Sequence, residues 1–245
     1  MIHSKRHTGR VPSALVLVHD AVPGRGEREV GSVGPALTEL GFDVLVTTLL
    51  PGAPAVPDPA DVDVIVVLGS AEAADDDSVP WLAAELDLIA RAVGHGTPVL
   101  GICFGAQALA RVLGGKVGRA PRSERAFVAL GSSDTDLLPR GEWMQFHDDM
   151  FTLPADAQQL ARNDVGLQAF TCGPHVAVQF HPEITPDAFG AWMDAWEDEG
   201  VRAEIEAQVD VPAMVAEIAA RADASAAACR TLVTRFCARA GVTAS

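Results

Sequence analysis

Short runs of branched apolar residues recur through the first hundred positions, and turn-forming residues bound each run. Apolar runs of this length, without polar alternation, are typical of strands that are buried on both faces of a parallel sheet. They predict strands at Ala14–Val18, Val44–Thr48, Val62–Leu68 and Pro98–Ile102.

Segments with helical periodicity lie between these strands, at roughly Val30–Leu40 and Val79–Val93. In the second segment one apolar stripe is formed by Leu82, Leu86, Ile89 and Val93. Because strand and helix alternate, the pattern predicts an α/β fold with a doubly wound, mainly parallel sheet of the flavodoxin-like type.

The chain changes character between Lys116 and His181, where short candidate strands are separated by turns. These strands are Ala126–Leu130, Trp143–Phe146, Leu167–Phe170 and Val176–Phe180. They predict an antiparallel extension of the parallel sheet.

The pattern is helical from Pro186 onward, with one helix over Asp187–Glu199 and another that starts near Asp210. There the aspartate can cap the helix and Pro212 falls in its first turn. We therefore expect a loose tail over residues 1–12, one domain over 13–199, and a C-terminal helical extension over 200–245. This extension would pack on the domain or on a partner subunit, which leaves a homo-oligomer open.

Composition narrows the classes of function. The 245 residues carry a formal charge of −15, and an acidic surface repels the phosphates of nucleic acids. No apolar run approaches the roughly 20 residues that span a bilayer. The four cysteines form no CxxC pair, so we expect reduced thiols in a cytoplasmic protein that binds neither nucleic acid nor membrane.

The segment Pro98–Gln107 is the most informative in the chain. An apolar strand stops at Gly101, Cys103 follows between two glycines, and apolar helix positions come next. This arrangement predicts a nucleophile elbow, which exposes the central side chain at the carboxyl edge of a sheet. The helix N-terminus favours a thiolate there, and the N–H of Phe104 would face an oxyanion. On this segment alone, a buried structural cysteine remains the alternative.

A second segment supplies candidate partners for the thiol. Apolar residues from Val176 lead into His181, Pro182 and Glu183. A cysteine, a histidine and an acidic third member are the groups that thiol acyl transfer requires. His181 would accept the proton of Cys103, and Glu183 would orient the imidazole.

The two segments together resemble the class I, triad-type glutamine amidotransferases. The motifs are Gly-Ile-Cys-Phe-Gly-Ala-Gln at 101–107 and Gln-Phe-His-Pro-Glu at 179–183, in the family's order and separation. Within the family, the chain is most similar to stand-alone proteins that resemble the amidotransferase domain of GMP synthase. That similarity depends on Pro80-Trp81-Leu82 and on the segment Trp143–Phe151.

The resemblance implies roles for individual residues. The γ-carboxamide of glutamine would acylate Cys103, and Gly69 would supply an oxyanion N–H beside that of Phe104. Gln107 would contact the amino-acid end of the substrate, and His147 would lie near the mouth of the site. No cofactor is implied, and the aspartate clusters at 75–77 and 148–149 are too thin a ligand set to predict a metal site.

One departure from the family is visible after the third strand. The family usually has Gly-Gly-Pro there, whereas this chain has Leu68-Gly69-Ser70. Leu68 carries a β-carbon where a backbone free to adopt positive φ is usual, so substrate fit and activity are in question.

Three functions remain open from the sequence. The first is a glutaminase that releases ammonia for a separate synthetase subunit, because the chain carries no P-loop or other synthetase signature. The second is a hydrolase of γ-glutamyl amides or peptides that acts without a partner. The third is a non-catalytic or DJ-1-like protein with a reactive thiol, which the His-Pro-Glu segment disfavours.

Overall fold

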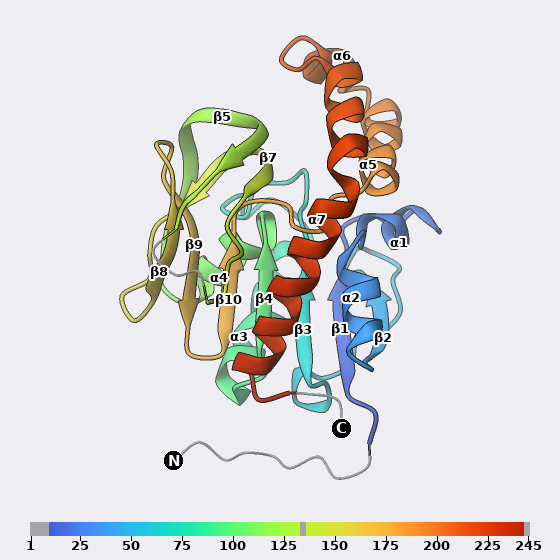
Figure 1. The fold of residues 1–245 in the computed structure, drawn as a ribbon. Helices are drawn as coiled ribbons and strands as arrows, with labels where there is room; N and C mark the ends of the chain where they lie inside the picture. Colours follow the sequence, from blue (N-terminus) through green and yellow to red (C-terminus); the bar gives the residue numbers. More distant parts are fainter. Residues whose placement is uncertain (1–9, 133–135, 243–245) are drawn as a thin grey trace.

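The computed structural model describes residues 10–132 and 136–242. The first nine positions of the loose tail expected over residues 1–12 lie outside these ranges. Within them, the main sheet has the strand order β2-β1-β3-β4-β10-β9-β8-β6, and β5 and β7 form a separate pair (Figure 1). The strands of the main sheet are β1 Ser13–Leu17, β2 Asp43–Thr47, β3 Val64–Val67, β4 Val99–Ile102, β6 Gly131–Ser132, β8 Gln158–Arg162, β9 Leu167–Cys172 and β10 His175–Val178.

The first five strands of this order run parallel, from β2 at the edge to β10. Every residue of β3, β4 and β10 is buried, as expected for strands covered on both faces. The four N-terminal strands predicted from apolar runs are confirmed to within two residues at either end. Beyond β10, the strands β9, β8 and β6 are antiparallel, which confirms an antiparallel extension.

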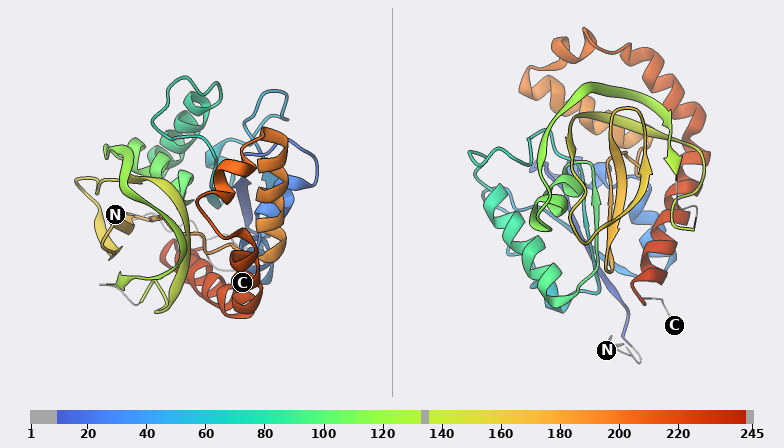
Figure 2. Two further views of the ribbon diagram at one scale, coloured as in Figure 1. Left: turned by 90° about the horizontal axis from the view of Figure 1, so that it is seen from above. Right: turned by 90° about the vertical axis from the view of Figure 1, so that its left-hand side faces the viewer.

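Two of the predicted extension strands lie elsewhere. β5 (Val117–Ala129) and β7 (Glu142–Phe151) pair antiparallel with each other and not with the main sheet. Their register shifts between Arg119 and Glu124, and such an irregularity bends a strand. The pair therefore curves over the carboxyl edge of the sheet, as Figure 2 shows.

Helices cover both faces of the main sheet. The helices α3 (Leu82–His95) and α4 (Phe104–Val112) pack on one face, and α2 (Val33–Glu39) packs on the other beside α7 (Val211–Arg239). The predicted doubly wound α/β fold is thereby confirmed. No helix in the described part of the chain is both long and apolar enough to cross a membrane.

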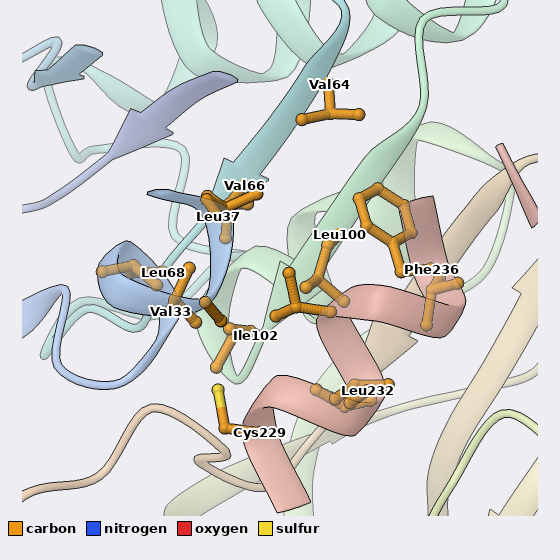
Figure 3. Packing of buried hydrophobic residues seen from close by; sticks show 14 of the residues in the cluster. Val33, Leu37, Val64, Val66, Leu68, Leu100, Ile102, Cys229, Leu232 and Phe236 are labelled. Atoms are coloured by element: carbon orange, nitrogen blue, oxygen red, sulfur yellow. The ribbon is translucent and has the colours of Figure 1, made fainter. Parts of the chain in front are cut away.

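The 29-residue helix α7 belongs to the core. Its last turns place Cys229, Leu232 and Phe236 against the buried face of the sheet (Figure 3). Its start is capped as the sequence predicts, because the carboxylate of Asp210 accepts a hydrogen bond of 3.0 Å from the N–H of Ala213.

The first half of α7 packs against α5 (Pro186–Glu199), through Val211, Met214 and Ile218. Three short elements complete the fold: α1 Arg25–Glu29, α6 Arg202–Glu206 and the 3₁₀ turn Pro59–Asp61. Figure 1 shows α5 and α6 above the carboxyl edge of the sheet, on the opposite side from β5. This edge, where strands β3 and β4 end, holds the candidate site.

Candidate active site

Cys103 occupies a sharp turn between β4 and α4. Its backbone has φ 51° and ψ −107°, and it is the only non-glycine residue of the described ranges with positive φ. Such a conformation is strained and persists only where neighbouring contacts hold it. The N–H of Cys103 donates to the carbonyl of Val178 at 2.8 Å. The geometry is that of the predicted nucleophile elbow.

The two flanking glycines are required by close packing. A β-carbon on Gly105 would lie 2.1 Å from the carbonyl oxygen of Val67, and one on Gly101 would lie 2.4 Å from the carbonyl oxygen of Gly105. The sequence pattern predicts that the glycines supply the freedom of the turn. In the structure the cysteine itself takes the strained conformation, and the glycines let helix α4 approach the sheet.

His181 and Glu183 form a buried pair on the turn after β10. The Nδ1 atom of His181 donates to a carboxylate oxygen of Glu183 at 2.7 Å, and both side chains are at most 4 % exposed. The N–H of His181 donates to the carbonyl of Met144 at 2.8 Å, which ties the turn to β7. The indole of Trp192 packs edge-on against the imidazole, with ring centroids 4.7 Å apart.

The thiol and the imidazole meet beside Gly69. A β-carbon built on this glycine would lie 3.1 Å from Cε1 of His181 and 3.7 Å from Cβ of Cys103. Burial by itself lowers the pKa of His181, but the charges of Glu183 and of the Cys103 sulfur outweigh burial and raise that pKa well above its usual range. Nε2 makes no hydrogen bond to the described residues. The bond from Nδ1 to Glu183 thus fixes the orientation of the ring, and the raised pKa favours its protonated form.

Gln179 contacts the thiol directly, a role that was not predicted from the sequence. Its amide nitrogen lies 3.6 Å from the sulfur of Cys103, and its amide oxygen accepts from Gln107 at 3.4 Å. Gln107 also donates to the carbonyl of Asp149 at 3.3 Å. The signal that could have revealed Gln179 was its position two residues before His181 in the quoted motif.

His147 lies on β7, opposite Glu124 of β5, and is fixed in the wall of the site. Its Nδ1 donates to the carbonyl of Asp149 at 3.0 Å, and its Nε2 lies 3.1 Å from a carboxylate oxygen of Glu124 without hydrogen-bond alignment. Burial tends to raise the pKa of Glu124, but its polar partners His147, Asn163 and Gln168 lower it overall. This carboxylate therefore stays ionised beside the imidazole.

All seven site residues chosen from the sequence line one cavity of about 760 Å³: Gly69, Cys103, Phe104, Gln107, His147, His181 and Glu183. Helices α5 and α6 form one wall of this cavity and strands β5 and β7 the other. Neither wall was predicted from the sequence. Phe146, Trp192 and Trp196 form an aromatic cluster there, with ring centroids 5.5 to 5.7 Å from Phe146.

Leu68 is accommodated without a special backbone conformation. Its φ is not positive, and its side chain is buried in the core at 2 % exposure. Its carbonyl accepts a hydrogen bond of 3.1 Å from the N–H of Gly105, so this residue helps to hold the elbow. The departure from Gly-Gly-Pro is therefore compatible with the site geometry.

None of the four cysteines forms a disulfide. Cys229 and Cys237 are buried small residues, as expected, and burial raises the pKa of the Cys237 thiol to about 12. Cys172 is only half-buried, and its thiol lies 3.8 Å from the carbonyl oxygen of Asp156. Burial also raises the pKa of the Cys172 thiol, which disfavours its reactive thiolate form.

Comparison with known proteins agrees with this geometry. Residues 35–195 match the family model described as glutamine amidotransferase class-I. A glutamine-hydrolyzing GMP synthase of Aeropyrum pernix is 34 % identical over 125 residues, which are 47 % of this chain and 24 % of that protein. A protein of Ignicoccus hospitalis, named as one subunit of glutamine-hydrolyzing GMP synthase, is 33 % identical over 96 residues, 36 % of this chain and 51 % of that one. The matches thus span a quarter to a half of these relatives' own length.

Solved structures share the fold. A glutamine amidotransferase from Thermotoga maritima superposes with a TM-score of 0.80 at 23 % identity, over 93 % of this chain and 98 % of that one. One from Methylobacillus flagellatus gives 0.77 at 22 % identity, over 96 % of each chain. The family match covers well over half of the 245 residues. The chain therefore belongs to the class I glutamine amidotransferase family.

Proposed function

We propose that this chain hydrolyses the γ-carboxamide of glutamine through a thioester on Cys103, with His181 and Glu183 as the other members of a catalytic triad. The observation that carries the proposal is the strained cysteine beside an imidazole whose opposite nitrogen donates to a buried carboxylate at 2.7 Å. A buried structural cysteine requires neither partner.

The proposed reaction has two halves. The sulfur of Cys103 attacks the amide carbon, and His181 gives its proton to the departing nitrogen, so that the C–N bond breaks and ammonia leaves. Water then attacks the thioester carbon, His181 takes a proton from that water, and the C–S bond breaks to give glutamate and the free thiol. Glu183 keeps the imidazole oriented and stabilises its charged form in both halves.

The oxyanion of each tetrahedral intermediate needs donors beside the sulfur. We assign this role to the N–H groups of Gly69 and Phe104. Gly69 follows strand β3, and Phe104 is the first residue of helix α4. Gln107 and His147 line the same cavity. Their polar groups contact the carbonyl of Asp149, so we assign them to shaping the wall on which the amino-acid end of the substrate rests.

The ammonia would pass to a separate synthetase. Two of the similar proteins, from Ignicoccus hospitalis and Thermococcus kodakarensis, are named as single subunits of GMP synthase. These names support a partner subunit for this chain as well. The acceptor of the ammonia stays open.

A second candidate, a hydrolase of γ-glutamyl amides or peptides, is favoured by the size of the cavity. Its volume of about 760 Å³ falls in the range of about 300–1,000 Å³ that is typical of sites for ligands larger than one amino acid. Glutamine would leave much of this space unfilled. An amide with a larger leaving amine would contact the walls from α5, α6 and β5.

One assay separates these functions. The protein is incubated alone with glutamine and with γ-glutamyl dipeptides, while ammonia and free amine are followed, and Cys103→Ala is run in parallel. Slow glutamine turnover that increases when a synthetase partner is added supports the first function, and rapid dipeptide cleavage by the chain alone supports the second. If neither substrate reacts and a glutamine-like electrophile fails to label Cys103, both proposals are wrong and the reactive-thiol alternative stands.

A further inference from the structure

Behind the proposed oxyanion donors lies a buried ion pair that the triad does not use. The imidazole of His19, just after β1, lies 3.0 and 3.1 Å from the two carboxylate oxygens of Glu85 in α3. The two side chains are 4 % and 1 % exposed. Because an unpaired carboxylate at this depth is costly, each charge depends on the other.

The second ring nitrogen of His19 faces the candidate site. The Nδ1 atom of His19 donates to the carbonyl of Gly69 at 2.7 Å. Since Nδ1 faces a carbonyl and Nε2 a carboxylate, both nitrogens donate and the ring is a cation. Burial alone lowers the pKa of His19, but the charge and hydrogen bonds of Glu85 outweigh it and raise that pKa.

The same imidazole also packs on the second proposed donor. Its ring centroid lies 4.9 Å from that of Phe104, in an edge-on arrangement, and 4.9 Å from that of Trp81. One side chain thus contacts both residues whose N–H groups we assign to the oxyanion.

We propose that His19, held by Glu85, is a positioning residue that fixes the backbone of Gly69 and the start of helix α4 as one oxyanion hole. This inference rests on the proposed function, because it assigns the pair to the same acyl chemistry. Among the described residues, no hydrogen bond, ion pair or ring contact joins His19 to the thiol or the triad, so it acts through Gly69 and Phe104. An oxyanion hole works only when its donors are fixed in advance.

The test uses paired substitutions, because a single change would leave a buried charge alone. His19→Leu with Glu85→Leu removes both charges and the donor to Gly69. His19→Asn with Glu85→Gln is equally neutral, but the asparagine amide nitrogen can replace Nδ1 as the donor. Both are made in a Cys172→Ala background and compared for kcat, KM and the rate at which iodoacetamide alkylates Cys103.

Alkylation separates a positioning role from general damage, because displacement of iodide forms no oxyanion and needs no oxyanion hole. We expect the leucine pair to lower kcat by about 100-fold, the usual cost of losing one oxyanion donor, while KM and the alkylation rate change little. The asparagine–glutamine pair should recover about tenfold of that loss. If the leucine pair does not fold, His19→Gln with Glu85→Gln replaces it, since its amide falls at the Nε2 position, away from Gly69.

Other results would overturn the proposal. Unchanged kcat in the leucine pair, a parallel loss of alkylation, or no recovery in the asparagine–glutamine pair would each show that the ion pair does not position the donors. The parent protein is measured alongside. If it turns over no amide at all, the proposed function fails and this inference fails with it, whereas an active parent with unaffected variants refutes the inference alone.

Discussion

Replacing Gly69 with alanine adds one β-carbon beside Cys103 and His181, the two side chains that we propose to react. This carbon would lie 3.1 Å from Cε1 of His181, so the imidazole must retreat by a few tenths of an ångström. It cannot retreat freely, because its Nδ1 is held by Glu183 at 2.7 Å and Trp192 packs against its face. Misplacement by 1 Å costs about 100-fold in rate, so this smaller shift should lower kcat by about tenfold.

Folding should be affected far less than catalysis. The φ of Gly69 lies outside the left-handed region, and the crowded atoms border a cavity, so overpacking should cost only about 1 kcal/mol. The assay is kcat with KM, together with the thermal midpoint Tm. Gly94→Ala is the control for kcat, because its β-carbon meets nothing within 4 Å. Its Tm should rise slightly, because alanine favours helix α3 more than glycine does. An alanine at Gly69 with full kcat would show that the imidazole does not occupy the reacting position.

Three further predictions concern the scaffold and the thiol. Burial holds the pKa of His175 at about 4 against an ordinary value of 6.5. The neutral side chain therefore contributes about 3 kcal/mol to the free energy of unfolding above pH 6.5, and this contribution is lost as the pH falls toward 4. The N–H of Val99 donates to Nδ1 of His175 at 3.3 Å. His175→Asn, whose amide oxygen can accept the same bond, should remove this pH dependence from the free energy of unfolding between pH 4 and 6.5. Phe236→Ala should lower the free energy of unfolding by about 3–5 kcal/mol in denaturant titration, and a value under about 1 kcal/mol would mean that α7 is not part of the core. Gln179→Leu removes the amide that faces the Cys103 sulfur and should slow its alkylation by iodoacetamide by about tenfold, as the loss of one hydrogen bond to a charged group predicts.

The sequence could place the proposed triad residues together because they lie in two short, strongly patterned segments. An apolar strand that stops at a Gly-x-Cys-x-Gly turn has few other physical uses, and His181 follows a second buried strand in the same sheet. Parallel strands end at one edge, so two such strand ends bring their side chains together. These two local patterns were therefore enough to predict that Cys103 and His181, distant in the sequence, lie close together.

The remaining parts of the site depend on contacts that no local pattern encodes. Glu85 lies beside the predicted apolar stripe of α3, and only the distant His19 explains why a carboxylate is buried there. The signal that could have revealed His19 was its position at the carboxyl end of a buried strand. Likewise, the apolar residues of β7 predict a strand but not its partner, because pairing with β5 depends on the bend between Arg119 and Glu124.

In the proposed mechanism, Cys103 carries the acyl group during turnover. The most direct measurement is the mass of the intact protein, quenched in acid within the first turnovers of its preferred amide, followed by peptide mapping. We expect an added γ-glutamyl group on the peptide that contains Cys103, absent in Cys103→Ala and discharged by hydroxylamine. Turnover without any such adduct, or an active Cys103→Ala protein, would contradict it.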